Sequence, residues 1–152
     1  MAGERKLWER VRSRLAPFFY IQRIENMVGE GVPDVLLVCR KTGAMVLVEL
    51  KSVSGLPVRA KSKVFGSGGL NPQQVAWIYG RSSSGCRIWV LAGADRGLMW
   101  LVPGGHAREF NDWGVNDLTP YLITYDTLVL CLQQPPPLLA PSVTPDKTSE
   151  EE

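Results

Sequence analysis

The residues best suited to chemistry lie at the ends of two apolar segments. Asp34 opens the segment 34–39, Glu49 lies near the end of the segment 45–50, and Lys51 follows it directly. An unpaired charge in an apolar setting carries a large free-energy penalty. Carboxylates and an ammonium at these positions therefore indicate either a shared chemical use or strand ends that meet solvent.

The two apolar segments must form the elements that position these charges. Both are rich in Val and Leu, and the connector Arg40-Lys41-Thr42-Gly43 has the chemistry of a turn, which predicts a β-hairpin of buried strands. In a strand, residues two apart share a face, so Glu49 and Lys51 project together. In the hairpin, Asp34 lies at the same open end as Glu49.

Two neighbouring carboxylates repel each other unless a cation lies between them, and oxygen ligands of this kind suit Mg²⁺, with Mn²⁺ as a substitute. The carbonyl of Leu50 would add a third oxygen ligand beside Asp34 and Glu49. An ammonium such as Lys51 beside that cation suits a phosphate or an attacking water.

Pro33-Asp34 followed by Glu49-Leu50-Lys51 resembles the signature of the PD-(D/E)XK nuclease superfamily. With Gly31 to Asp34, Val48 to Lys51 and Leu70 to Gln74, the chain is most similar to the small virus-type replication-repair nucleases (VRR-NUC) and the Holliday-junction-resolvase-like nucleases. The resemblance spans about residues 5–92. It implies an α/β fold: a single domain with a mixed central sheet flanked by helices, the αβββαβ core of restriction endonucleases.

The resemblance also implies roles for particular residues. Asp34, Glu49, Lys51 and Gln74 would be catalytic, with Asp34, Glu49 and the Leu50 carbonyl as metal ligands. Gln74 matches the position where related families place a glutamine near the scissile phosphate, although an exposed glutamine in a first helical turn is a nearly equal alternative. The product end would be a 5′-phosphate.

The helix expected over residues 4–15 has apolar residues at helical spacing and a polar face dominated by arginines. In related nucleases the first helix often supplies an accessory acid. Glu9, Glu4 and the loop residue Glu30 are the candidates here, with a solvated position as the better interpretation for each. A strand is expected over residues 18–24, at an edge of the sheet.

Residues 52–69 are expected to form the least ordered internal loop, and Arg59, Lys61 and Lys63 in it are candidate DNA contacts. Asn71 and Pro72 predict a helix start. Further strands are expected over residues 86–91 and 98–102, a loop over 82–85, a short helix over 118–121 and a strand or helix over 125–132. A lone histidine, His106, is expected to be solvated or to cap a turn.

The 152 residues suit one domain, with a formal net charge of +2. We expect a nuclease domain over residues 1–132 and a disordered tail over 133–152, because Pro135-Pro136-Pro137 and the acidic end offer little apolar surface to bury. The three cysteines form no paired framework, so buried reduced thiols are expected. No apolar stretch suits a membrane span or a signal peptide.

The sequence therefore predicts a Mg²⁺-dependent DNA endonuclease, structure-specific for junctions or branches, serving repair, recombination or phage replication. We expect it to act as a homodimer or higher homo-oligomer in the cytoplasm of a bacterial or phage-infected cell, or with the nucleoid, without secretion or membrane attachment. A sequence-specific restriction or homing endonuclease is one alternative. A non-catalytic nucleic-acid-binding or assembly module on a nuclease fold is another.

Overall fold

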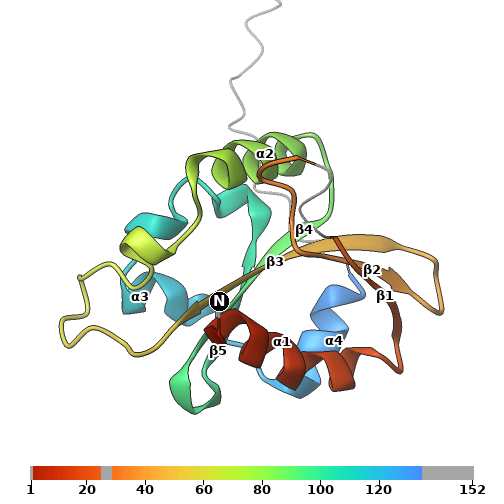
Figure 1. The fold of residues 1–152 in the computed structure, drawn as a ribbon, viewed down its shortest axis with the longest axis horizontal. Helices are drawn as coiled ribbons and strands as arrows, with labels where there is room; N and C mark the ends of the chain where they lie inside the picture. The colour runs from red at the N-terminus through yellow and green to blue at the C-terminus, as the bar shows by residue number, and fades with distance from the viewer. Residues whose placement is uncertain (1, 25–28, 135–152) are drawn as a thin grey trace, which may run out of the picture.

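The computed structural model describes residues 2–24 and 29–134, and Figure 1 shows their arrangement. Five strands form one mixed sheet in the order β1-β2-β3-β4-β5. Only the pair β3–β4 is parallel, and the other neighbours are antiparallel. The strands and longer helices are α1 (Ala2–Leu15), β1 (Phe19–Arg23), β2 (Val35–Cys39), β3 (Met45–Val53), α2 (Pro72–Ser83), β4 (Ile88–Ala94), β5 (Met99–Pro103), α3 (Val115–Leu118) and α4 (Tyr125–Leu132).

The sheet separates two apolar cores, one on each face. On one face, α1 and α4 pack through residues such as Leu7, Val11 and Leu128 against Val48 and Leu50 of β3. On the other face, Ile78 of α2, Phe110 and Leu118 pack against Ile88 and Val90 of β4. In Figure 1, α1 and α4 accordingly lie below the sheet and α2 lies above it. Helices on both faces of a mixed sheet confirm the expected α/β class.

The predicted hairpin is present. Val35 pairs with Val48 and Val38 with Met45, and the turn between the strands includes Gly43 at a φ of +72°. Because Asp34 and Glu49 each lie one residue beyond the Val35–Val48 pair, they meet at the same end, as expected. The edge position predicted for the first strand is also confirmed, since β1 pairs only with β2.

The segment 52–69 is more ordered than expected. β3 continues to Val53, Val64 and Phe65 are buried, and the Val64 amide donates to the Trp113 carbonyl at 3.0 Å. Burying Phe65 against Phe110, with ring centroids 4.9 Å apart, anchors this segment. Its exposed part is the tip around Val58.

Two other expectations need correction in the second half of the chain, and the choice left open between a strand and a helix for residues 125–132 is settled as a helix. Helix α2 continues through Ser83, where a loop was expected from residue 82, because the Ser83 hydroxyl donates to the Tyr79 carbonyl and the helix ends with Gly85 at positive φ. Residues 119–121 form a 3₁₀ turn after α3, and residues 125–132 are helical, started by the Thr124 cap.

His106 and the cysteines also differ from the expectation. His106 is half-buried, 3.0 Å from the Tyr121 hydroxyl through Nε2 and 3.2 Å from Glu109 through Nδ1. All three cysteines are free, but only Cys39 is buried, and Cys86 is exposed. No helix in the described part of the chain is long and apolar enough to cross a membrane. The tail expected over residues 133–152 lies outside the described residues from 135 onward.

Candidate active site

The Asp34 side chain is fixed to β3 by a hydrogen bond from a backbone amide of that strand. Its Oδ2 accepts from the Leu50 amide at 2.9 Å. The Leu50 side chain packs in the core between α1 and the sheet, so the bond joins the start of β2 to a fixed point of β3. Asp34 itself remains partly exposed, which leaves this carboxylate open to solvent.

Glu49 is the buried acid of the site, with 1% of its surface exposed. Its Oε1 accepts from Gln74 Nε2 at 2.8 Å, whereas its Oε2 is buried without a hydrogen-bond partner. Burial raises the pKa of Glu49 to about 9, and the charge of Asp34 acts in the same direction, against the opposing charge of Lys51. At neutral pH this carboxyl therefore holds a proton unless a cation compensates its charge.

Lys51 lies on the same side of β3 as Glu49, as the alternation of a strand requires. Its Nζ is 3.8 Å from Glu49 Oε1, and the residue is 8% exposed. Because the Glu49 carboxyl holds a proton at neutral pH, it does not balance the charge of this buried ammonium, and a nearby anion would be favourable.

Gln74 reaches the site from the first turn of α2. Asn71 caps this helix by accepting from the Gln74 amide at 2.8 Å, and Gln74 Oε1 accepts from the Asn71 amide at 3.0 Å, which completes a capping box. The remaining donor, Nε2, holds Glu49. Gln74 is thus fixed at both ends of its amide and positions Glu49.

Two residues, Gly31 and Asn111, support this helix start through contacts between distant segments. Gly31 has a φ of +89°, and a Cβ there would lie 2.7 Å from the Gln73 carbonyl carbon, so only glycine lets the chain before Asp34 pass α2. Asn111 accepts from the Leu70 amide at 2.8 Å and donates to the Leu70 carbonyl at 2.7 Å. No local pattern predicts either contact, because each joins distant segments.

Among the three candidates for an accessory acid, Glu4 is the one near the site. Burial raises its pKa, with an opposing effect from Lys51 and a further increase from the charge of Asp34. Glu9 instead forms an exposed pair with Arg5 at 3.2 Å, and Glu30 is exposed in its loop.

The candidate DNA contacts Arg59, Lys61 and Lys63 are exposed, in the part of the loop that precedes the buried Val64. Lys63 is paired with Asp112 at 2.9 Å, and no ion pair among the described residues involves Arg59 or Lys61. In Figure 1 this loop extends from the end of β3 to the left margin of the molecule.

The donor set suits a hard cation. Within residues 2–24 and 29–134, no three acids, histidines or cysteines come together as a ready cage. Mg²⁺, however, is commonly bound by one or two carboxylates, with waters and substrate phosphates completing its shell. Asp34 and the unpartnered Oε2 of Glu49 fit that requirement, and the raised pKa of Glu49 makes a cation the natural replacement for its proton.

No protein-family model matches the chain, and no curated protein matches it significantly in sequence. Among solved structures, the chain is similar to Hjc, a Holliday junction resolvase from the archaeal hyperthermophile Archaeoglobus fulgidus, with a TM-score of 0.53 and 15% sequence identity. The match covers 85% of this chain and 97% of the resolvase chain. At this identity the likeness establishes the fold, and it confirms the αβββαβ core that the sequence resemblance implied.

Proposed function

We propose that this chain is a metal-dependent endonuclease that hydrolyses phosphodiester bonds in DNA and selects branched or junction substrates. The shared fold with a Holliday junction resolvase supports the nuclease class. Because resolving a junction requires cuts in two strands, we expect two copies of the chain to act together. Such an enzyme would serve repair, recombination or phage replication where DNA is held, in the cytoplasm or nucleoid.

The observation that carries the proposal is the buried Glu49 beside Asp34 and Lys51. A carboxyl with 1% exposure and an oxygen without a partner is costly to the fold unless it serves a ligand. A structural role would be met more cheaply by an apolar residue on β3. This argues against the non-catalytic module, since clustered carboxylates repel the phosphates that such a module would bind.

Asp34, Glu49 and the Leu50 carbonyl would hold Mg²⁺, or Mn²⁺ in its place. When bound, the cation would neutralise charge on the scissile phosphate and favour ionisation of a water. Glu4, whose pKa is affected by the charges of Lys51 and Asp34, would be the accessory acid on α1.

Lys51 would stabilise negative charge that develops on the phosphate, from a position already shielded from water. Gln74 would keep Glu49 Oε1 occupied and so direct Oε2 toward the cation. This is a positioning role for the residue that the resemblance places near the scissile phosphate.

The test is cleavage of fork, four-way-junction and linear duplex DNA by the Asp34→Asn and Glu49→Gln variants. Each substitution keeps side-chain size and removes an anionic ligand, so we expect cleavage to fall by at least about 100-fold while the melting temperature is retained. Arg12→Ala, an exposed change on α1, is the matched control and should cleave as the wild type.

Cleavage above about 1% of wild type in either variant would place the chemistry elsewhere. Cleavage of short duplex sites with no preference for branches would favour the sequence-specific alternative.

A further inference from the structure

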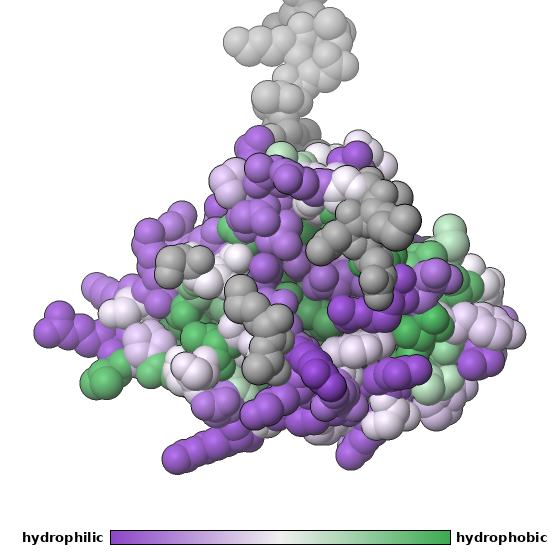
Figure 2. Space-filling view, viewed as in Figure 1, coloured by the Kyte–Doolittle hydropathy of each residue, from purple (hydrophilic) through white to green (hydrophobic). Residues whose placement is uncertain are grey.

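A polar pocket of about 740 Å³ lies between α1 and the ends of the parallel strands β3 and β4. The surface around α1 is largely hydrophilic, as Figure 2 shows. Ser52 lines the pocket from β3 and faces α1, because a Cβ on Gly3 of that helix would clash with the Ser52 hydroxyl. Since side chains alternate along a strand, Lys51 and Glu49 face the other side of the sheet. The pocket is therefore separate from the proposed active site.

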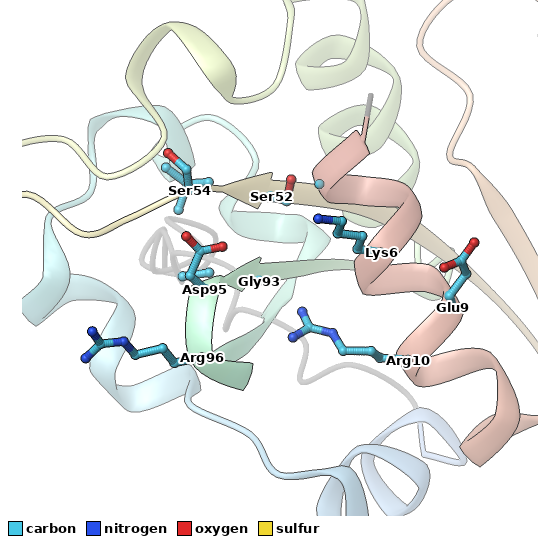
Figure 3. Close-up of a pocket in the computed structure, with 11 residues that line it drawn as sticks. Lys6, Glu9, Arg10, Ser52, Ser54, Gly93, Asp95 and Arg96 are labelled. Atoms are coloured by element: carbon cyan, nitrogen blue, oxygen red, sulfur yellow. The ribbon is translucent and has the colours of Figure 1, made fainter.

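Figure 3 shows the charged side chains that line this pocket. Lys6 extends from α1 toward the end of β3, and Arg10 extends toward the turn between β4 and β5, while Glu9 points away. On the opposite wall, Asp95 extends from that turn toward the end of β3, and Arg96 turns outward. The pocket therefore has two cations on its α1 wall and one carboxylate on the wall that faces them.

The two cations of the α1 wall are exposed and have no ionic partner in the part of the chain that the structure describes. No ion pair there involves Lys6 or Arg10, and Glu9 is paired with Arg5 at 3.2 Å. Because Lys6 and Arg10 lie four residues apart on α1, their like charges repel each other. Carboxylate or phosphate groups bound between them would remove this repulsion, so the pocket suits an anionic ligand.

The chain itself carries an acidic segment beyond Gln134, the last residue that the structure describes. Within residues 135–152, the acids Asp146 and Glu150-Glu151-Glu152 outnumber the single Lys147, which leaves a net charge of −3. An anionic ligand for the pocket is therefore present in every molecule.

The charges of this segment match both walls of the pocket. Glu150 to Glu152 form a run of anions that complements Lys6 and Arg10 on α1. Lys147 precedes the run by roughly 10 Å of extended chain, and its charge complements Asp95 on the opposite wall. A DNA strand offers phosphates to the α1 wall but no cation to Asp95, which would repel it. The acidic segment is therefore the better fit of the two.

The described chain also ends on the side of the sheet where the pocket lies. α4 packs with α1 against the same face, and the Arg14 guanidinium lies over the Tyr125 ring, 4.6 Å from its centroid. Followed along the two helices, the path from Gln134 back to Lys6 is about 40 Å at most. The segment from Gln134 to Glu150 spans about 50 Å when extended, so the acids reach the pocket of their own chain. A tether of this length holds them at an effective concentration of about 1 mM, so even weak binding fills the pocket.

We propose that residues 146–152 dock in this pocket of their own chain, with the glutamates between Lys6 and Arg10 and with Lys147 beside Asp95. This inference goes beyond the proposed endonuclease function and does not depend on it. Because the acids occupy the cations of α1, the docked segment would exclude other polyanions, DNA among them, from this face of the helix.

The first experiment measures nitrogen-15 relaxation of the full chain without DNA, with the amides of Glu150 to Glu152 as probes. In low salt we expect their order parameters to exceed about 0.6, and in Lys6→Ala/Arg10→Ala to fall below it. Salt at about 1 M, where the screening length is about 3 Å, should lower them in the wild type as well. Arg12→Ala/Lys41→Ala removes the same charge from exposed positions outside the pocket and should behave as the wild type.

The second experiment inverts the charges on both sides. The tail variant Glu150→Lys/Glu151→Lys/Glu152→Lys should release the segment, and so should the pocket variant Lys6→Glu/Arg10→Glu. Combining the two sets of substitutions should restore the order parameters, because opposite charges meet again. The amide chemical shift of Gly93, which lines the pocket, should move in the tail variant and return in the combination. Thermal melts check that each variant is folded.

Order parameters that stay low in the wild type, or that are insensitive to Lys6 and Arg10, would overturn the proposal, and so would failure of the combined charge inversion. Loss of order on about tenfold dilution would assign the bound segment to a second copy and overturn docking within one chain. If branched DNA in Ca²⁺ shifts the Gly93 amide while the order parameters of the acids stay low, the pocket belongs to DNA and the proposal is wrong. None of these measurements uses cleavage, so failure of the endonuclease proposal leaves this test intact.

Discussion

Glu49 combines burial, a close carboxylate and a close ammonium in one side chain. With its pKa raised to about 9, it is neutral over the range in which most carboxyls are ionised. Ionising Glu49 in the folded protein therefore has a free-energy cost, which a cation beside the carboxylate would remove.

That cost predicts a pH-dependent stability. Glu49 ionises near its ordinary value of 4.5 in the unfolded chain and near 9 in the folded one, so between these values the folded chain holds the extra proton. Its contribution to stability is complete below pH 4.5 and is lost as the pH rises toward 9, by up to about 1.4 kcal/mol per pH unit. Glu49→Gln removes this loss.

In EDTA, we expect the melting temperature of Glu49→Gln to equal that of the wild type near pH 5 and to exceed it increasingly toward pH 9. Thermal melts at several pH values measure this. Mg²⁺ should raise the wild-type value at pH 8 and leave the variant nearly unchanged. An offset between the two proteins that is the same at every pH would contradict the assigned environment of Glu49.

One substitution at Gln74 can separate its role in capping α2 from its role in positioning Glu49. Gln74→Glu keeps the acceptor that completes the capping box with Asn71 and replaces the donor to Glu49 by a second carboxylate. We expect the helix to be retained and cleavage to fall roughly 10–100-fold, the range seen when partners of metal ligands are changed. Circular dichroism and cleavage assays measure the two effects, and wild-type cleavage would reduce Gln74 to a helix cap.

At the scale of elements, the site depends on the contact between the chain before β2 and the start of α2. Gly31 lies against Gln73, and Asn111 ties the residue before the Asn71 cap through both of its backbone groups. Neither residue touches Glu49. Both residues fix the position of Gln74 relative to the sheet. They therefore set the distance between the Gln74 amide and the Glu49 carboxyl.

Gly31→Ala and Gly43→Ala test this contact as a matched pair. Both glycines have positive φ, but a Cβ meets the Gln73 backbone only at Gly31 and nothing within 4 Å at Gly43. Backbone strain should cost each variant about 1 kcal/mol, and the clash should add to it at Gly31.

Urea unfolding measures the difference in stability, and cleavage assays should show a loss for Gly31→Ala alone. Equal destabilisation with equal activity would mean that the α2 contact adjusts freely and does not position Gln74.

At the scale of the whole molecule, the face shown in Figure 2 is largely hydrophilic, with hydrophobic residues at a few places. Figure 2 shows the hydrophilic face around α1, with hydrophobic patches toward the β1–β2–β3 side and at the far loop tip, where Leu56 and Val58 are exposed. The loop after β3 carries the exposed residues Arg59 and Lys61 at the margin of the molecule. Cations there would suit contacts with a duplex arm that flanks the cleaved position.

Binding of branched DNA in Ca²⁺ should weaken with salt, and Arg59→Ala/Lys61→Ala should reduce the log–log slope by up to about 1.8, since each phosphate contact contributes roughly 0.9. Adding Lys63→Ala should change the slope little, because Lys63 is paired with Asp112. Fluorescence anisotropy over a salt series measures this. A slope equal to that of the wild type would exclude the loop from the DNA interface.

The sequence by itself determined the hairpin and the convergence of Asp34, Glu49 and Lys51. Turn chemistry and the two-residue alternation of strands act locally, so their consequences can be derived from residue order. The same holds for the start of α2, where Asn71, Pro72 and Gln74 form a cap within one turn. The resemblance added the fold class, which the structural match confirms.

Only the tertiary structure decided which acid approaches the site, what Gln74 binds and where a pocket lies. Glu4 meets the field of Asp34 and Lys51 because α1 packs across the end of β3, and Asn111 binds Leu70 across 41 positions of sequence. The burial that raises the pKa of Glu49 also depends on segments distant in the sequence, since Gln74 of α2 contacts its carboxyl group. Contacts of this kind depend on how whole elements pack, and no spacing within one segment encodes them.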